Sequence, residues 1–378
     1  MKFYILAGEK SGDFIGGKIM QAINKLIDNT EWSGVGGDNM AKSDLESLFP
    51  MDQISLMGFF EVLPHIFKLK KLIDDTVCDI LQKNPQIVIT IDSPGFTFRV
   101  AKKIKKKAPH IKLVHVVAPS VWAYKPDRAK KYAQIYDHML TLLPFEPQYF
   151  TVHNLPSICI GHPVLEQEFY KNSTALKEQM GITGNAKIIT VTAGSRKGEI
   201  NRHMLIIREA LDRLSTTHKI KALFVQADES NFYAIEKFLI GANFDYSFST
   251  NRLKSFAISD CALAKSGTNT LEIAASGTPM IIGYKLNAMT FFFLKMMIKI
   301  KYACLINIIS DKEIIPEYIQ SAFNADNIVL TLSELLDDPI QAQTQVRAAQ
   351  EVLKSIGLNA SQKPSKIAAK IIVDIVSS

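Results

Sequence analysis

Residues 262–284, ALAKSGTNTLEIAASGTPMIIGY, contain a strand, a turn of small residues, a short helix and a second strand. This order is typical of a parallel α/β sheet. A helix that begins on Ser266, Gly267 and Thr268 offers free backbone N–H groups to a phosphate. A carboxylate at Glu272, one turn further along, can accept hydrogen bonds from a sugar diol. We therefore predict a sugar-nucleotide site; the alternative is a plain turn with Thr268 as N-cap and Glu272 on a solvated face.

The length and composition indicate a globular chain of two domains. Its 378 residues are enough for two hydrophobic cores. The longest apolar region is interrupted by Lys295, Lys299 and Lys301, so no transmembrane helix is predicted. The N-terminus, MKFYILAGEK, lacks a cleavage-site pattern and is too short for a signal peptide. The net charge of +7 favours an anionic partner, which leaves phosphate, anionic lipid and nucleic acid open.

The cysteines favour neither a disulfide framework nor a metal site. All four lie in apolar contexts without a CxxC pair, at Cys78, Cys159, Cys261 and Cys304. This usage is typical of reduced core residues in a cytoplasmic protein.

The first half of the chain alternates short apolar runs with amphipathic segments, as a parallel sheet requires. The strand Phe3–Leu6 leads into a glycine-containing loop, and a second buried strand, Ile87–Ile91, ends at Asp92. Open α/β sheets place ligands at the carboxyl ends of their strands. Asp92 is therefore a candidate general base, with a turn cap as the alternative. Further strands are predicted at Leu113–Val117 and His138–Leu142.

The second half repeats this pattern. The strand Lys187–Thr192 is followed by a loop that contains Gly194, Ser195 and Arg196. Arg196 stands where a diphosphate would need to be neutralised; the alternative is a surface arginine on an ordinary loop. Strands are also expected at 222–226, 261–264 and 280–283. We predict domains at 1–163 and 164–340, and a C-terminal segment, 341–378, that is helical throughout from about Ile340.

Two apolar segments carry basic residues between their apolar ones. Met57–Leu72 and Asn287–Tyr302 fit either core helices or interfacial helices that contact a membrane. The basic run Arg99–Lys107 is typical of a solvated helix face and would also attract anionic headgroups. Asn307 is one polar residue inside an apolar run. If buried, its side chain needs a partner, which a ligand would supply.

A series of short motifs runs in order from Ala7 to about Asn327: AGEKSGD, ISLMGFFEVLPHI, TIDSPGF, VAPSVWAY, LPFEPQYF, GHPV, AGSR, KSGTNTLE and PMIIGYK. Taken in this order, the motifs resemble those of the lipid-A-disaccharide synthases. Each motif is weak by itself, but the collinear series is specific.

The resemblance implies the GT-B fold, an α/β fold of two Rossmann-like domains facing each other across a cleft. It also implies an inverting glycosyl transfer from UDP-2,3-diacylglucosamine to 2,3-diacylglucosamine 1-phosphate. The products are the β(1→6) disaccharide 1-phosphate and UDP. Peripheral contact with an anionic membrane, at the cytoplasmic side of the inner membrane, and no nucleic-acid partner are also implied. A homodimer stays open, as does packing of the C-terminal helices on the first domain or on a partner subunit.

Roles for individual residues follow from this resemblance. Asp92 would take the proton of the acceptor hydroxyl, and Arg196 would bind the departing UDP. The expected donor site comprises Gly194, Ser195, Arg196, Lys265, Ser266, Gly267, Thr268, Glu272 and Asn307. Glu9, Ser11, Gly12 and Asp13 match the N-terminal loop of the family. The membrane-contact candidates are Phe59, Phe60, Phe67, Phe291 and Phe292. No metal and no cofactor are expected.

This chain departs from many relatives at two places. It has Gly95, Phe96 and Thr97 where they have Asp-Phe-Asn, and Ala193 where they have proline. The alternatives are another GT-B enzyme, such as a UDP-N-acetylglucosamine 2-epimerase or the transferase that makes lipid II, and a non-enzymatic nucleotide- or lipid-binding protein. The two enzymes would share the SGT…E donor pattern but not VAPSVWAY or ISLMGFFEV.

Overall fold

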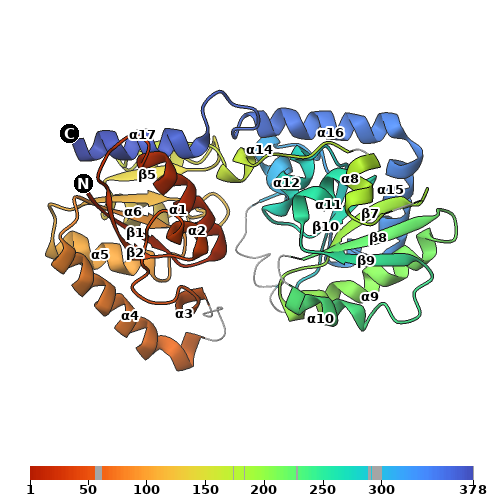
Figure 1. Ribbon diagram of the computed structural model, residues 1–378, viewed down its shortest axis with the longest axis horizontal. Helices are drawn as coiled ribbons and strands as arrows, with labels where there is room; N and C mark the ends of the chain where they lie inside the picture. The colour runs from red at the N-terminus through yellow and green to blue at the C-terminus, as the bar shows by residue number, and fades with distance from the viewer. Residues whose placement is uncertain are drawn as a thin grey trace. The chain divides into compact units, whose positions relative to one another are not determined.

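The computed structural model describes residues 1–55, 62–172, 174–182, 184–226, 229–287, 291 and 300–377. Contacts divide the chain into two compact units (Figure 1). The first unit comprises residues 1–166 and 359–378, and the second comprises residues 167–358. The sequence analysis placed its domain boundaries after residues 163 and 340, whereas the chain passes between the two units after residues 166 and 358.

The first unit is built on a parallel sheet of six strands in the order β2-β1-β3-β4-β5-β6. Short apolar runs form these strands because both faces of the sheet are covered. The strands are β1 (Lys2–Ala7), β2 (Glu31–Val35), β3 (Ile87–Ile91), β4 (Lys112–Val116), β5 (His138–Thr141) and β6 (Ser157–Cys159). The helices are α1 (Lys10–Ile23), α2 (Asp38–Ala41), α3 (Asp52–Ser55), α4 (Val62–Lys83), α5 (Thr97–Lys107), α6 (Arg128–Ala133) and α7 (Gln148–Thr151), with a 3-10 turn η1 (Pro163–Glu166).

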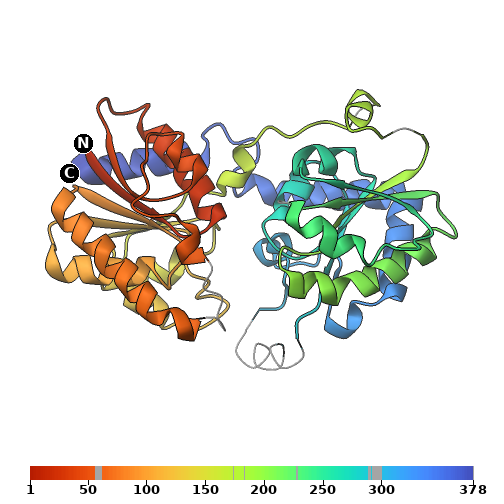
Figure 2. The same ribbon diagram turned by 60° about the horizontal axis from the view of Figure 1, so that its bottom comes forward.

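Alternate residues of each strand serve the two cores of this unit. Tyr4 and Leu6 of β1 pack in one core with residues of α4, α5 and α6. Phe3 and Ile5 point to the other face and pack with α1 and the C-terminal helix α17 (Pro364–Ser377). Figure 2 shows α4 and α5, in orange, and α17, in blue, on opposite sides of the sheet.

The second unit repeats the design with the strand order β12-β11-β10-β7-β8-β9, again all parallel. Its strands are β7 (Lys187–Thr192), β8 (Ile220–Val225), β9 (Asp245–Ser249), β10 (Cys261–Ala264), β11 (Met280–Tyr284) and β12 (Glu317–Ile319). Its helices are α8 (Thr174–Gln179), α9 (Lys197–Leu214), α10 (Phe232–Glu236), α11 (Arg252–Ile258), α12 (Asn269–Ala275), α14 (Leu305–Ser310), α15 (Ala325–Asp337) and α16 (Pro339–Lys354), with 3-10 turns η2 (Glu229–Asn231) and η3 (Gln320–Ala322).

Two groups of helices cover the faces of the second sheet. Ile189 and Val191 of β7 pack with α9, α10 and α15. On the other face, Thr190 of β7 lies within 2.6 Å of the Ser259 hydroxyl, directly after α11. Helix α12 lies beside α11, and α16 packs against α12 and α14 (Figure 1).

The C-terminal segment is not helical throughout, so this prediction was wrong. Helix α16 ends at Lys354 and α17 begins at Pro364. Gly357, with φ +109°, terminates the first helix, and the Leu358 N–H donates to the Leu353 carbonyl at 3.0 Å. A left-handed glycine after a helix and a proline at the start of the next are common helix boundaries. The break lets α16 pack in the second unit and α17 in the first.

The cysteines are all free, but they are not all core residues. Cys261 and Cys304 are buried, whereas Cys78 on α4 is exposed. In the described part of the chain, no helix combines the length and the apolar character needed to cross a bilayer.

Candidate active site

Asp92 lies directly after β3, at the carboxyl edge of the first sheet. Its N–H donates to the Val116 carbonyl at 3.0 Å and extends the pairing of β3 with β4 by one residue. The backbone then turns through left-handed φ values of +45° at Asp92 and +48° at Ser93. Burial raises the pKa of the Asp92 carboxyl, and the Ser93 N–H and the Arg128 guanidinium oppose this rise. A carboxylate with a raised pKa accepts protons more readily, as a general base must.

A buried polar network lies beneath Asp92. Thr90 and His115 are paired across β3 and β4, and the Thr90 hydroxyl is 2.7 Å from His115 Nδ1. Burial lowers the pKa of His115 to about 3, so the imidazole is neutral at physiological pH. Tyr132, one turn after Arg128 on α6, packs on His115 with ring centroids 5.2 Å apart. The sequence analysis missed this network because His115 appears as one residue of a buried strand.

The N-terminal loop contains one residue with a structural role. The Asp13 carboxylate is 3% exposed and accepts hydrogen bonds from the backbone N–H groups of Gly37, Asn39 and Met40 at 2.8–3.1 Å. Asn39 Nδ2 adds a fourth, at 2.8 Å. Asp13 therefore anchors the start of α2. Glu9 and Ser11 are exposed at the start of α1, and Gly12 is buried against β1 and β3.

In the second unit, the loop after β7 is held by a residue that the sequence analysis missed. Glu199, buried on the first turn of α9, accepts from the Ser195 N–H at 3.2 Å and pairs with Lys265 Nζ at 3.1 Å. Burial alone would raise the pKa of the Glu199 carboxyl. Lys265 and the Ser195 N–H favour the charged form more strongly, so the pKa lies below its ordinary value. Gly194 has φ +131°, and a Cβ atom there would lie 2.8 Å from Glu199 Cβ. Arg196, at the N-cap of α9, is exposed.

The turn after β10 brings several predicted donor residues together. The Ser266 hydroxyl donates to the Ala303 carbonyl at 2.7 Å, and Lys265 is half-buried. Among the described residues, none accepts a hydrogen bond from the backbone N–H of Gly267 or Thr268. Thr268 occupies the N-cap position of α12, but its exposed side chain makes no cap hydrogen bond.

Glu272 is 1% exposed, so the alternative of a solvated face was wrong. Its Oε1 accepts from Gln167 Nε2 and from an Arg252 Nη atom, both at 3.1 Å. Its Oε2 is buried and has no partner among the described residues. Burial raises the pKa of Glu272, and Arg252 and Gln167 oppose the rise. An unsatisfied buried carboxylate oxygen is costly, and a ligand hydroxyl is a partner that would satisfy it.

Asn307 has protein partners for its whole side-chain amide. Nδ2 donates to the Ile315 carbonyl and to Glu317 Oε1, both at 2.7 Å. Oδ1 accepts from the N–H groups of Ile314 and Ile315 at 2.9 and 3.0 Å. A side-chain amide has two donors and two acceptor positions, all of which are used here. The partner that the sequence analysis sought in a ligand is therefore protein.

The candidate membrane residues are only partly covered by the structure. Phe59, Phe60 and Phe292 lie outside the described residues. Phe67 on α4 is 84% exposed, and Phe291 is partly exposed. Among the described residues, no group of three or more His, Cys, Asp or Glu side chains is arranged to hold a metal ion.

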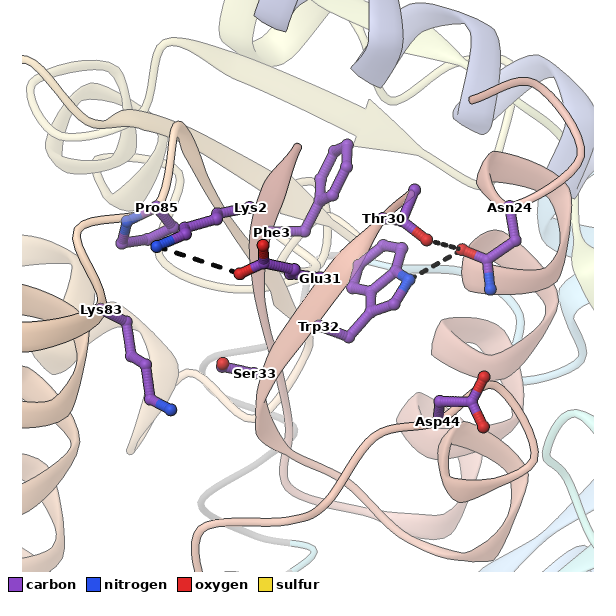
Figure 3. Close-up of a pocket in the computed structure, with 10 residues that line it drawn as sticks. All are labelled: Lys2, Phe3, Asn24, Thr30, Glu31, Trp32, Ser33, Asp44, Lys83 and Pro85. Carbon is purple, nitrogen blue, oxygen red and sulfur yellow. Dashed lines mark hydrogen bonds and ion pairs between the residues drawn. The ribbon is translucent and has the colours of Figure 1, made fainter. Parts of the chain in front are cut away.

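A pocket of about 370 Å³ lies at the other edge of the first sheet, beside the amino ends of β1 and β2 (Figure 3). Trp32 and Thr30 both donate to Asn24 Oδ1 there, at 2.8 and 2.7 Å. Because ligands of open α/β sheets bind at the carboxyl ends of the strands, this pocket is not the candidate active site.

Solved structures share the architecture of the whole chain. A UDP-N-acetylglucosamine 2-epimerase from Neisseria meningitidis, solved with its UDP-sugar, has a TM-score of 0.62 at 13% identity and covers 100% of both chains. MurG from Acinetobacter baumannii has a TM-score of 0.59 at 11% identity and covers 99% of both. At these identities the likeness concerns the fold alone, and the predicted GT-B class is confirmed.

The family comparison covers nearly all of the sequence. The family model described as lipid-A-disaccharide synthetase matches residues 3–371. The chain is 51% identical over 373 residues to the lipid-A-disaccharide synthase of Rickettsia felis, a match that covers 98% of this chain and 95% of the relative. It is 49% identical over 374 residues to the enzyme of Rickettsia prowazekii, with 98% of both covered. The resemblance inferred from the motifs is thereby confirmed, and the chain belongs to the lipid-A-disaccharide synthetase family.

Proposed function

We propose that Asp92 is the general base of the glycosyl transfer that this chain, as a lipid-A-disaccharide synthase, catalyses. The acceptor 6-hydroxyl oxygen attacks the anomeric carbon of UDP-2,3-diacylglucosamine, and the bond to UDP breaks. The hydroxyl proton passes to the Asp92 carboxylate, and the electron pair of the broken bond leaves with UDP. The position of Asp92 at the end of β3, together with its raised pKa, carries the proposal. Such a base contributes about 10²–10⁴-fold to the rate.

The donor is assigned to the second unit. The Glu272 Oε2 atom, buried without a partner, is proposed to accept a hydrogen bond from the ribose diol. The N–H groups of Gly267 and Thr268 and the side chains of Lys265 and Arg196 are proposed to bind the diphosphate. Helix α12 has seven residues, so its dipole is short and these cations supply most of the positive charge.

Four further predicted donor residues, Gly194, Ser195, Ser266 and Asn307, are proposed to shape the donor site without contacting the donor themselves. Gly194 and Ser195 shape the loop that presents Arg196, and Glu199 holds this loop. Ser266 ties the turn to Ala303. Asn307 is proposed to support the site indirectly, by fixing the segment that leads into β12. Glu9 and Ser11, exposed at the carboxyl end of β1, are proposed to contact the acceptor sugar.

A UDP-release assay with and without the diacylated sugar 1-phosphate tests the function. Acceptor-dependent release, with a disaccharide 1-phosphate seen by mass spectrometry, is expected. Asp92→Asn should abolish turnover and leave UDP binding nearly unchanged. Full turnover by Asp92→Asn would refute the role of Asp92. Activity on UDP-N-acetylglucosamine without an acceptor would instead favour an epimerase reaction.

We also propose peripheral contact with an anionic membrane at its cytoplasmic face, supported by the exposed Phe67 and the net charge of +7. Phe67→Ser should weaken binding to phosphatidylglycerol vesicles. Tyr233→Ser is the matched control, because Tyr233 is a 79% exposed aromatic residue of the other unit. Equal vesicle binding by both variants would refute Phe67 as a membrane contact.

A homodimer is tested by sedimentation, in which one chain corresponds to 42.2 kDa.

A further inference from the structure

The chain carries a strained turn at the proposed general base. Asp92 and Ser93 both have left-handed φ values, +45° and +48°, which residues with a Cβ atom rarely adopt. Ser93 also precedes Pro94, and a residue before proline ordinarily has a negative φ in the extended region. Two consecutive residues in this conformation persist only when their surroundings hold them there.

The φ angle of Asp92 matters for chemistry because it sets the direction of the Cα–Cβ bond relative to β3. If the turn relaxed to negative φ, the carboxylate would point elsewhere. The backbone conformation of this turn therefore determines the position of the Asp92 carboxylate. A residue that stabilises the turn also keeps the carboxylate in place.

Thr97 holds the turn from one side. Its side chain is fully buried, and its hydroxyl lies 2.5 Å from the Asp92 carbonyl oxygen and 3.1 Å from the Ser93 carbonyl oxygen. The backbone N–H groups of Phe96 and Thr97 also donate to the Ser93 carbonyl, at 2.9 and 3.0 Å. The Asp92 carbonyl belongs to the peptide plane between the two left-handed residues. A hydrogen bond to this oxygen therefore restricts the two torsion angles that flank the plane, ψ of Asp92 and φ of Ser93.

Gly8 closes the turn from the other side. A Cβ atom at Gly8 would lie 2.6 Å from the Ser93 hydroxyl oxygen and 2.8 Å from Ser93 Cβ. The backbone of the loop after β1 thus lies directly against the Ser93 side chain. The Ser93 hydroxyl has no partner among the described residues, so it does not hold the turn itself. In the described part of the chain, the hydroxyl of Thr97 is the side-chain group that does.

We propose that Thr97 is a positioning residue for Asp92, acting through the Asp92 carbonyl and not by contact with a substrate. This inference rests on the proposed role of Asp92 as general base. It predicts that loss of the Thr97 hydroxyl slows the chemical step without weakening substrate binding, since the donor and acceptor groups stay in place.

Thr97→Val keeps the shape of the side chain and removes its hydroxyl. We expect kcat to fall by about 10–100-fold, because a misplacement of about 1 Å can cost this much, while both KM values stay within about twofold. Thr97→Ser restores the hydroxyl and should recover most of kcat. The control is Thr76→Val on α4, since Thr76 is also fully buried in the first unit and donates to the Leu72 carbonyl at 2.7 Å.

Unfolding of the first unit is followed by tryptophan fluorescence, because both tryptophans lie in this unit. Thr97→Val and Thr76→Val should lose comparable stability, and only Thr97→Val should lose kcat. Equal kcat in the two variants, or no recovery in Thr97→Ser, would overturn the inference. Asp92→Asn is measured in the same assay. If it retains full turnover, the proposed base and this inference fail together; if it is inactive while Thr97→Val is fully active, only this inference fails.

Discussion

Replacement of Glu272 by glutamine should weaken UDP binding and stabilise the unliganded second unit. In the structure, Oε1 accepts from Gln167 and Arg252, and Oε2 is buried without a partner. In Glu272→Gln the amide oxygen can keep the first two contacts, and the NH₂ group takes the position of Oε2. The charge is lost while the shape is kept, so the variant isolates the effect of the carboxylate on the ribose.

The expected magnitude follows from the loss of charge at one hydrogen bond. A hydrogen bond to a charged group contributes about 1.5–3 kcal/mol and a neutral one about 0.5–1.5 kcal/mol. The difference of about 1–1.5 kcal/mol corresponds to a roughly 5- to 12-fold rise in the Kd for UDP.

The effect on stability has the opposite sign. Burial raises the pKa of Glu272, so the folded unit binds this proton more tightly than the unfolded chain does. The stability linked to this group is complete below the pKa of the unfolded chain and is lost as pH rises through the raised pKa of the folded unit. At neutral pH, Glu272→Gln should therefore unfold at a higher temperature than the unmodified chain.

Isothermal titration with UDP and with 2′,3′-dideoxy-UDP measures the ribose contact directly. The unmodified chain should bind the dideoxy compound more weakly, and Glu272→Gln should discriminate much less between the two ligands. For the unmodified chain, UDP affinity should fall as pH drops through the raised pKa of Glu272, and for the variant it should not. Glu351→Gln, a substitution of an exposed glutamate in the same unit, is the control. An equal loss of affinity for both ligands in Glu272→Gln would refute the ribose contact.

Three further substitutions test other parts of the two units. Arg128→Gln should move the acidic limb of the pH profile of kcat/KM to higher pH, because Arg128 opposes the rise in the pKa of Asp92; an unmoved limb would contradict this. Asp13→Asn should lower the stability of the first unit by about 1.5–3 kcal/mol, measured by tryptophan fluorescence in urea, since it removes a charged acceptor of four hydrogen bonds. Asn307→Leu leaves several buried polar groups unpaired at about 1–3 kcal/mol each, so the thermal transition of the second unit should fall clearly, and an unchanged transition would show that water or a rearrangement replaces the amide.

The alternation of apolar runs with amphipathic segments determined the fold class from sequence alone. A strand covered on both faces must be apolar along its length, so the runs at 87–91, 187–192 and 280–283 identify parallel strands without knowledge of their neighbours. The same logic placed Asp92 at a carboxyl edge. The strand β12 was missed because Glu317–Ile319 is three residues long and no residue in it is fully buried, so it has no apolar run to detect.

The partners of the polar residues were decided by the tertiary structure. Asp13, Asn307 and Glu272 each appear in the sequence as a polar group in a promising loop or helix. Asp13 and Asn307 are fully used by backbone and side-chain groups of the protein 7–27 positions away, whereas one oxygen of Glu272 is left without a partner among the described residues. Whether a buried polar group serves the fold or a ligand depends on which donors the packing brings within about 3 Å, and local pattern carries no information on that. The sequence analysis gave Glu199 no role and noted Thr97 only as a departure from many relatives, because their roles lie in contacts that exist only once the strands and helices are assembled.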